Sequence, residues 1–557
     1  MFVLQLLALG GLTLAGVKAI KNRKNKIEVL GKATDTAEVE SDPVLPAKLI
    51  VSPERVRRDM RLSGVALGLS VSGVLLSTPL LVVMSLPSIL CVATPIFQGA
   101  IRELRQRRVE SDSQRTVRLI TCLAAGLYSL AALDLILQMA KRRKEIKTEK
   151  NFSHQLATKL GHSVEHVWVS NDGAELEMPL SQVTSGTAII LNPGDMIPFP
   201  GVVTKGKGRM RPMLDTGSPG EAFTVDDAVV AGFVVVEGTM EIKLQKLPVV
   251  LSDVRQELEQ AVSGKTELTQ MCVETGSLLS PWMMGAFLMG LPFLGLSRTA
   301  VFLTTRMGLQ MDTLGPHTSR QVIMTGLENG LFIRDLAAME RANTINTIVF
   351  DCALLSHPSA KGLIYPLLAS LRSRHWSTPV TQMNPKPFAI YVVVDNEETG
   401  KNLMDTYGFD DYFNEPLEWG RTRAIKSLQL TGRKVCYVGL PGFCNQTMTE
   451  ATLSVAWCLD GIPKPSAASI LLGQAHLRDL STLFDLARAF VNRQGANFLV
   501  PLGVDFMVMS ICLFLSNGLF YSILLSNTAA LIDVSGAGFV KRESLSERTE
   551  TEPTPAH

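Results

Sequence analysis

Charged residues are scarce in this sequence: Lys, Arg, Asp and Glu make up 19% of its 557 residues, and the formal net charge is only +2. No basic stripe interleaved with aromatic residues is present, so we expect no nucleic-acid partner. The eight cysteines include no CxxC pair, which argues against a zinc site and predicts free thiols rather than disulfides. A mean hydropathy of +0.20 is instead high for a soluble protein and indicates a membrane protein.

Long apolar segments predict transmembrane helices, because a helix needs about 20 apolar residues to cross a bilayer. These segments are residues 62–100, 117–140, 278–311 and 498–532, together with residues 1–20. The first should form a hairpin broken near Ser85 to Pro87, and the last two of the four should form helix pairs, giving roughly six to eight spans. Residues 117–140 lie between two basic flanks, so they form either a tight hairpin turning at Gly126 or an exception to the positive-inside rule.

The basic flanks also predict the orientation. Residues 18–26, 55–61, 102–108 and 141–150 are all rich in Lys and Arg, which favours a cytoplasmic position for each. Residues 1–20 lack a basic start and a cleavage site, which favours a retained anchor over a cleaved signal peptide. We therefore expect a protein of the bacterial inner (plasma) membrane whose polar domains are cytoplasmic.

Two polar segments of different pattern separate the apolar blocks. Between residues 164 and 247, short β-rich runs alternate with Gly and Pro, which predicts a small all-β module. Its expected strands are residues 167–169, 188–191, 201–204, 228–237 and 240–244. Between residues 344 and 476, apolar strands precede amphipathic helices, which predicts a doubly wound parallel sheet. Strands expected at 347–351, 389–395 and 434–439 place Asp351, Asp395 and Gly439 at the edge where such sheets bind ligands.

These patterns divide the chain into eight parts. We expect an anchor (1–20), a linker (21–61), membrane helices (62–140), a small all-β domain (160–250), a helix pair (273–316), an α/β domain (330–480), a second helix pair (496–533) and a disordered tail (541–557).

Short motifs add to this organisation. Residues 192–198 are NPGDMIP, residues 214–222 are LDTGSPGEA, residues 231–232 are AG, and residues 330–341 lead into TIVFD at 347–351. In this order they resemble the motifs PGDxIPxDG, DESxLTGES, AGT and GILIKxxxALE…TIVFDKTGT of the heavy-metal-transporting (copper/zinc type) P-type ATPases. The resemblance implies a multi-span α-helical membrane protein with an all-β actuator-like domain and an α/β HAD-like (Rossmannoid) domain, from which most of the nucleotide-binding domain is deleted.

The resemblance assigns Asp351 as the nucleophile that accepts the γ-phosphoryl group. The neighbouring Lys of the family is Cys352 here, and residues 353–355 are ALL in place of Thr-Gly-Thr. Phosphoryl transfer depends on such positioning and charge-stabilising groups, so their loss removes most of the catalysis. The magnesium loop GDGxND has become GLPGFCN at 439–445, in which Leu440 cannot bind Mg²⁺.

Three further positions carry the comparison. Arg421 stands where the family has a second phosphate-sensing Lys, and Glu221 is retained in the actuator loop although Pro219 replaces its Thr. Only residues 352–388 separate Asp351 from the next strand, whereas the family inserts well over about 100 residues there, enough for a separate nucleotide-binding domain. We name Asp351, Glu221 and Arg421 as vestigial catalytic residues and no nucleotide-binding residue. Mg²⁺ and ATP are cofactors only if activity is retained.

Candidate metal ligands lie in the apolar segments. The family's Cys-Pro-Cys triplet falls on residues 307–309, where Met307, with Met311 and Asp505, would be ligands for a copper or zinc ion. The alternative is that the methionines only pack. Ionisable or amide side chains in or beside spans are often functional; besides Asp505 these are Asp134, Asp312 and Asn527. Cysteines at 352, 436, 444 and 458 either gather near the sheet ends or serve as small buried apolar residues.

The leading hypothesis is a P-type ATPase-like membrane pseudoenzyme without ATP turnover, which acts as a structural, regulatory or partner-binding component. Its expected partners are the lipid bilayer that surrounds it and another protein in a membrane complex. The alternative is transport of copper or zinc by a divergent P-type ATPase. An active pump completed by another chain is the third.

Overall fold

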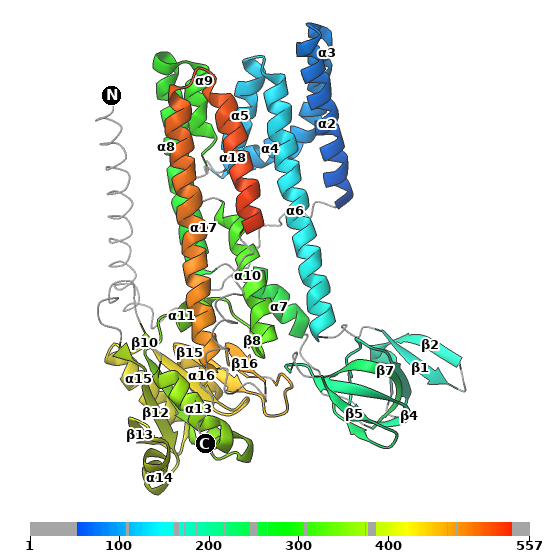
Figure 1. Ribbon diagram of the computed structural model, residues 1–557, viewed down its shortest axis with the longest axis vertical. Coiled ribbons are helices and arrows are strands. Elements are labelled where there is room, and N and C mark those ends of the chain that lie inside the picture. The colour runs from blue at the N-terminus through cyan, green and yellow to red at the C-terminus, as the bar shows by residue number, and fades with distance from the viewer. Residues whose placement is uncertain are drawn as a thin grey trace, which may run out of the picture.

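The computed structural model describes residues 53–106, 111–160, 166–171, 174–184, 186–215, 219–245, 254–263, 266–305, 310–373, 375–376, 386–464, 466–473, 477 and 480–536. The expected anchor, the tail and residues 21–52 of the expected linker lie outside these residues. The rest of that linker is helical, because α2 (Pro53–Leu75) begins within it. A helix bundle occupies one end of the molecule, and two domains that contain β-sheets occupy the other (Figure 1).

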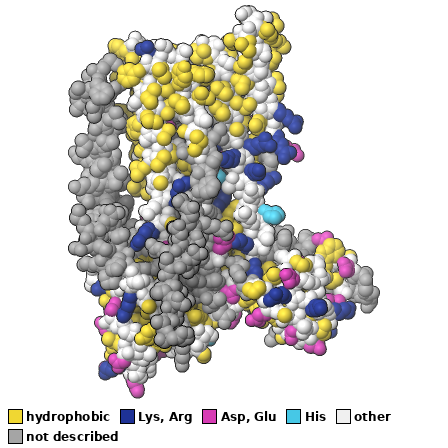
Figure 2. Space-filling view, in the orientation of Figure 1, with side chains coloured by type: hydrophobic (Ala, Val, Ile, Leu, Met, Phe, Trp, Pro, Cys, Tyr) yellow, Lys and Arg dark blue, Asp and Glu magenta, His cyan; other side chains and the backbone are white. Residues whose placement is uncertain are grey.

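The bundle is built from helices of very different length. They are α2, α3 (Pro79–Met84), α4 (Leu86–Arg105), α5 (Ser111–Ala124), α6 (Tyr128–Leu160), α8 (Glu267–Leu294), α9 (Leu296–Thr299), α10 (Met311–Glu328), α17 (Leu480–Phe514) and α18 (Gly518–Gly536). Within the described residues, three helical stretches are long and apolar enough to cross a membrane: Pro79–Arg105, Gln260–Leu294 and Leu480–Phe514. Apolar side chains cover the upper part of the bundle, and Lys and Arg gather below them (Figure 2). The count of six to eight spans stays a prediction.

The turns of the bundle correct part of the expectation. The first hairpin reverses at residues 76–78, where Ser77 has φ 53°, and not at Ser85 to Pro87. Ser85 keeps helical angles and its hydroxyl donates to the Val82 carbonyl at 2.6 Å, while Pro87 lies in the first turn of α4, where no amide proton is needed. Residues 117–140 form the hairpin alternative: α5 and α6 meet at Gly126, whose φ is 71°.

The described part of residues 278–311 does not form a pair of long helices. After α8, Gly295 adopts a φ of 75° and the chain continues as the four-residue α9 and the 3-10 helix η2 (Ala300–Leu303). The next long helix, α10, begins only at Met311 and descends toward the β-containing domains (Figure 1). The second expected pair, by contrast, consists of α17 and α18.

The antiparallel domain consists of seven strands in one sheet. They are β1 (His166–Asn171), β2 (Ala174–Pro179), β3 (Ala188–Leu191), β4 (Gly201–Pro212), β5 (Glu221–Phe223), β6 (Ala228–Val229) and β7 (Phe233–Leu244). Their order is β2-β1-β3-β7-β4-β5, with β6 beside β4. The strand expected at 201–204 extends to Pro212 because its polar half pairs with β7 through two bulges. The strand expected at 228–237 is divided between β6 and β7.

The mixed-sheet domain has the strand order β13-β12-β9-β14-β15-β16-β8. Its strands are β8 (Leu331–Ile333), β9 (Thr347–Asp351), β12 (Ala389–Val394), β13 (Asp411–Asn414), β14 (Val435–Gly439), β15 (Leu453–Trp457) and β16 (Ile470–Leu472). The sheet is mixed rather than wholly parallel, because β8 pairs antiparallel with β16 at the edge. Every residue of β9, β14 and β15 is buried, as expected for strands covered on both faces.

Helices cover this sheet. They are α11 (Ala337–Ala342), α12 (Cys352–Leu355), α13 (Lys361–Arg372), α14 (Glu397–Tyr407), α15 (Glu418–Leu430) and α16 (Asn445–Glu450), with the 3-10 helix η3 (Pro358–Ala360) and the two-stranded β10 (His375–Trp376) and β11 (Lys386–Pro387). α17 joins the domain to the bundle: Phe484 in its first turns stacks on Phe388 with ring centroids 5.1 Å apart. At 35 residues it is about 52 Å long, so it reaches from the sheet into the apolar part of the bundle.

Candidate functional site

The candidate site lies where β9, β12 and β14 end. β9 lies between the other two strands and is parallel to both, so their carboxyl ends meet at one edge of the sheet. Asp351 is the last residue of β9, Asp395 follows β12, and Gly439 ends β14. The strand order thus brings together the residues that parallel-sheet topology predicts near a ligand.

Both oxygens of the Asp351 carboxylate have hydrogen-bond donors. Oδ1 accepts from the Ala353 backbone N–H at 2.9 Å, which caps the first turn of α12. Oδ2 accepts from Arg421 Nη1 at 2.5 Å and from the Tyr437 hydroxyl. The residue is 1% exposed. Asp351 is therefore a buried carboxylate that the protein itself neutralises and holds.

Arg421 is the cation of the site. It belongs to α15, is 1% exposed, and bridges two carboxylates by donating to Asp351 and, through Nη2, to Asp395. Its Nε donates to the Glu415 carbonyl at 3.0 Å, and the Phe443 ring lies over its outer face at 5.5 Å. Burial lowers the pKa of Arg421, but the charge of Asp351 together with smaller contributions from Cys444 and Tyr437 raises that pKa by more, so the guanidinium stays charged.

Tyr437 is a site residue that the sequence analysis missed. It lies on β14, two residues before the strand ends at Gly439, and its ring is fully buried. Burial and the charge of Asp351 raise the pKa of its hydroxyl well above the usual value, so it remains a neutral donor. A Tyr in an otherwise aliphatic strand beside the strand that ends in Asp351 was the available signal, because a buried hydroxyl needs a partner.

The donor set does not fit a magnesium ion. Mg²⁺ prefers several carboxylate and water oxygens in an octahedral arrangement. Here the guanidinium of Arg421 lies between the two carboxylates that could have shared the ion, and the loop position that would supply another carboxylate is Leu440. The Asn445 side-chain oxygen already accepts from the Ala467 backbone at 3.2 Å. The residues of this site therefore do not fit a bound Mg²⁺ ion.

The cysteines do not form a metal centre. Cys352 donates to Asp395 Oδ2 at 3.5 Å, and Cys444 accepts from Arg421 Nη1 at 3.4 Å, so two of the four candidates lie at the site. Burial, followed by the nearby carboxylate charges, raises the pKa of Cys352 to about 12, and burial likewise raises that of Cys444. Cys436 and Cys458 are fully buried. Burial raises the pKa of Cys436 and Cys458 as well, so all four thiols are protonated at neutral pH. Cys352 and Cys444 lie near the sheet end, while Cys436 and Cys458 are small buried residues.

Glu221 lies apart from this cluster in the sheet topology. It begins β5, pairs with Met210 across the antiparallel sheet, and is exposed. A neighbouring part of the same domain makes the contact with the mixed-sheet domain instead. The Leu214 N–H donates to the Gly461 carbonyl at 3.0 Å. A Cβ at Gly473 would lie 2.7 Å from Asp215 Oδ1, so this docking depends on glycine.

The candidate metal ligands are only partly placed. Met307 lies outside the described residues. Met311 is fully buried at the start of α10, and Asp505 is 6% exposed on α17. The helices run in opposite directions and are joined by the hydrogen bond from Asn497 Nδ2 to Thr318 Oγ1 at 2.7 Å. Counting about 10 Å back to Met311 and about 12 Å on to Asp505 puts these two residues at about the same height in the bundle. Among the described residues, no group of three or more His, Cys, Asp or Glu is placed to hold a metal ion.

The remaining polar candidates of the bundle separate into two cases. Asp134 is buried and forms a salt bridge with Arg118 at 2.9 Å. Gln138 and Asn527 also donate to it, at 2.9 and 2.8 Å, so α5, α6 and α18 are tied together. Asp312 is exposed in the first turn of α10, which is a favourable place for an acidic residue.

Comparison with known proteins gives the relationship. Residues 161–249 match the P-type ATPase actuator domain. Over 290 residues the chain is 21% identical to the probable copper-exporting P-type ATPase V of Mycobacterium tuberculosis (strain CDC 1551 / Oshkosh), which covers 48% of this chain and 38% of that protein. The copper-exporting P-type ATPase of Staphylococcus aureus (strain JH9) is 25% identical over 239 residues, 40% of this chain and 30% of that protein. These matches support a relationship between this chain and the heavy-metal P-type ATPases.

The match to these P-type ATPases is partial, since it spans less than two fifths of their length. The antiparallel domain lies within the residues that match the P-type ATPase actuator domain. A crystal structure of a zinc-transporting PIB-type ATPase aligns with 88% of this chain and 99% of that chain, at 13% identity and a TM-score of 0.44.

Proposed function

We propose that this protein is a P-type ATPase-like pseudoenzyme of the membrane, which does not turn over ATP and serves as a structural, regulatory or partner-binding component. The observation that carries the proposal is that the Asp351 carboxylate is buried and both of its oxygens are hydrogen-bonded. Its two oxygens are bound by Ala353, Arg421 and Tyr437, and the residue is 1% exposed.

The chemistry follows from that arrangement. An aspartyl nucleophile must present a free oxygen to the γ-phosphorus in line with the leaving group, with cations beside the transferring phosphoryl group. For phosphate transfer to Asp351 Oδ2, this oxygen would have to give up its hydrogen bonds to Arg421 and Tyr437. The arginine that would compensate phosphate charge instead compensates the nucleophile.

The connection after Asp351 supports the same conclusion. Residues 352–388 lead from β9 to β12, and their described part consists of α12, η3, α13 and the short strands β10 and β11. Separate domains have at least about 50 residues, so this connection is too short to contain a nucleotide-binding domain. We name the mixed-sheet domain HAD-like on the basis of this topology and of the position of Asp351.

Exposed apolar side chains beside the site favour a binding role. Leu417 and Trp419 are each 56% exposed and Phe443 is 48% exposed. Arg423 stacks over Trp419 at 4.8 Å. Exposed groups of this kind, with Trp and Arg among them, are typical of protein interaction sites. The basic flanks favour a cytoplasmic position for this surface. We propose that a protein partner binds there.

ATP hydrolysis by the purified full chain tests the proposal. We expect no Mg²⁺-dependent activity, with or without copper or zinc ions, above that of Asp351→Asn prepared in the same way. Turnover that requires Asp351 would refute it. For the binding role, Trp419→Ala and the matched control Tyr365→Ala, which alters another exposed aromatic residue of the same domain, are compared by pull-down from solubilised membranes. The partner should be lost only with Trp419→Ala.

Transport of copper or zinc is the second candidate. The relatives are named as copper-exporting ATPases, and Met311 and Asp505 lie at about the same height on adjacent helices. A thioether suits Cu(I) and a carboxylate suits Zn²⁺. The candidate predicts metal in the purified protein that is lost in Met311→Leu or Asp505→Asn, while protein free of copper and zinc after growth with both metals would count against it.

A further inference from the structure

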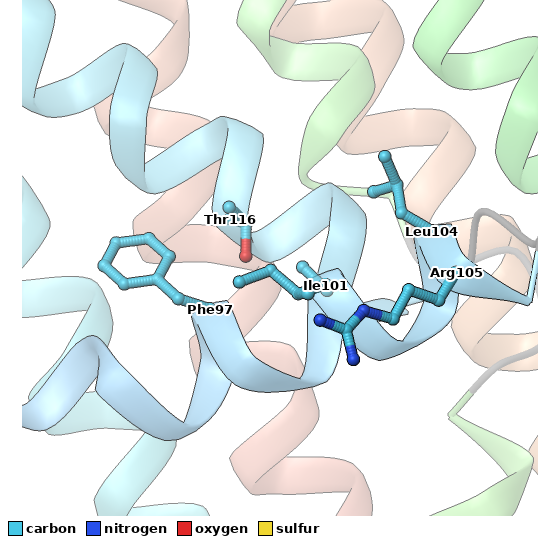
Figure 3. Close-up of a pocket in the computed structure, with 6 residues that line it drawn as sticks. Phe97, Ile101, Leu104, Arg105 and Thr116 are labelled. Atoms are coloured by element: carbon cyan, nitrogen blue, oxygen red, sulfur yellow. The ribbon is translucent and has the colours of Figure 1, made fainter.

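A groove on the helix bundle combines an apolar lining with a cation. It has a volume of about 560 Å³ and is lined by Phe97, Ala100, Ile101, Leu104 and Arg105 of α4 and by Thr116 of α5. Figure 3 shows the Arg105 side chain folded back along α4 toward Ile101, with Thr116 across from them on α5. Ile101 and Leu104 are 55% and 65% exposed, so the groove opens outward from the bundle.

Among the described residues, no counter-ion pairs with the charge at this end of α4. Arg102 and Arg105 lie in its last turn and are exposed. Within the described part of the chain, neither guanidinium makes a salt bridge or a hydrogen bond. Two nearby acidic side chains bind other groups: Glu103 accepts a hydrogen bond from the Ser113 backbone N–H at 2.9 Å, and Asp112 forms a salt bridge with Arg115. An anion from outside the protein is therefore the complementary partner.

The groove also contains an unused polar atom. Thr116 Oγ1 is buried and has no hydrogen-bond partner among the described residues. A buried hydroxyl without a partner is unfavourable, so an oxygen of a bound molecule would improve the site. The same wall thus offers apolar contact, one hydroxyl and one guanidinium.

The position along the bundle matches the level of lipid headgroups. α4 runs from α3, at the end of the bundle far from the β-containing domains, toward those domains, so Arg105 marks the near end of an apolar span (Figure 1). Lys and Arg side chains gather at the border between the apolar surface and the domains (Figure 2). Basic pockets between membrane helices at this level bind anionic lipid headgroups.

We propose that this groove binds one anionic phospholipid from the leaflet on the side of the β-containing domains. One acyl chain lies against Phe97, Ile101 and Leu104, the phosphate pairs with Arg105, and a glycerol or ester oxygen meets Thr116. A zwitterionic lipid satisfies the apolar wall but not the net positive charge. The proposal is independent of whether ATP is hydrolysed.

Native mass spectrometry of the full chain in detergent, titrated with phosphatidylglycerol or phosphatidylcholine, tests the site. We expect one phosphatidylglycerol to bind more tightly than phosphatidylcholine, and Arg105→Gln to weaken it about fivefold, since one Arg near the headgroups contributes on the order of a factor of five. Arg57→Gln is the matched control: it removes an exposed, unpaired charge from α2 and should leave binding unchanged. Ile101→Gln, also exposed, should weaken both lipids.

Three results would overturn the proposal. These are equal binding of the two lipids, an equal loss in Arg57→Gln and Arg105→Gln, or a photo-crosslinker at Leu104 that captures a polypeptide in native membranes instead of a lipid. The last result would assign the groove to a partner helix.

Discussion

Replacing Arg421 by Met tests how much of the site is held together by charge. The change leaves the Asp351 carboxylate, 1% exposed, without its cation, while its bonds to Ala353 and Tyr437 remain. Removing one partner of a buried ion pair costs about 3–5 kcal/mol. The change also removes the ion pair between Arg421 and Asp395. Because the Asp395 side chain is 56% exposed, losing this second pair adds only about 0–1 kcal/mol. The expected destabilisation is therefore set by Asp351.

The assay is thermal unfolding of the full chain in detergent. We expect the unfolding midpoint of Arg421→Met to fall on the order of 10 °C, given a few degrees per kcal/mol for a domain of this size. Lys426→Met is the control on the same helix as Arg421, and it removes a half-exposed salt bridge with Glu450 of α16. Such a pair contributes at most about 1 kcal/mol, so the midpoint should fall by only a few degrees.

The double variant Asp351→Leu with Arg421→Met gives the decisive comparison. Replacing both partners of a buried ion pair by apolar residues is often neutral or stabilising, so most of the lost stability should return. If the double variant is as unstable as Arg421→Met alone, Arg421 acts by packing and the charge argument is wrong.

Three further predictions concern neighbouring groups. Tyr437→Phe removes a donor to a buried charge and should cost about 1.5–3 kcal/mol by the same unfolding assay; a change near zero would contradict the contact with Asp351. Burial raises the pKa of Cys352 from 9.0 to about 12, so folding favours the protonated thiol and the stability should fall as the pH rises through this range. Cys352→Ala should make the stability less dependent on pH there, and an unchanged dependence would contradict the raised pKa. Gly473→Ala should increase hydrogen exchange at residues 210–215, because its Cβ would lie 2.7 Å from Asp215 Oδ1, and unchanged exchange would show that the docking tolerates a side chain.

Local patterns were sufficient where a few adjacent residues decide the structure. β9 has the bounds expected for it because a buried apolar run ends in an Asp whose side chain caps the next helix. Gly126 turns the α5–α6 hairpin because glycine accepts a positive φ without strain. The turn of the first hairpin was predicted at the wrong place. Ser77 adopts a positive φ, which a serine in the sequence does not predict, and Pro87, expected to break the helix, is tolerated in the first turn of α4.

The site itself depended on contacts between distant residues. Asp351 and Arg421 were named from their motifs, but their ion pair joins residues 70 positions apart, so no local sequence pattern predicts it. Tyr437 was missed because whether a strand residue reaches a neighbouring strand's carboxylate depends on register and side-chain length. The polar half of β4 was missed because exposed Lys and Arg residues carry no apolar alternation, although they pair with β7 as regularly as the apolar half does.

Phosphorylation is the most direct test of the central claim, which is that the buried, hydrogen-bonded carboxylate of Asp351 does not accept a phosphoryl group. The full chain is incubated with γ-labelled ATP and Mg²⁺, quenched in acid, and compared with Asp351→Asn. The account predicts no acid-stable, hydroxylamine-sensitive label above that variant, in the presence or absence of copper or zinc. Label that appears on the wild-type chain and disappears with Asp351→Asn would contradict it.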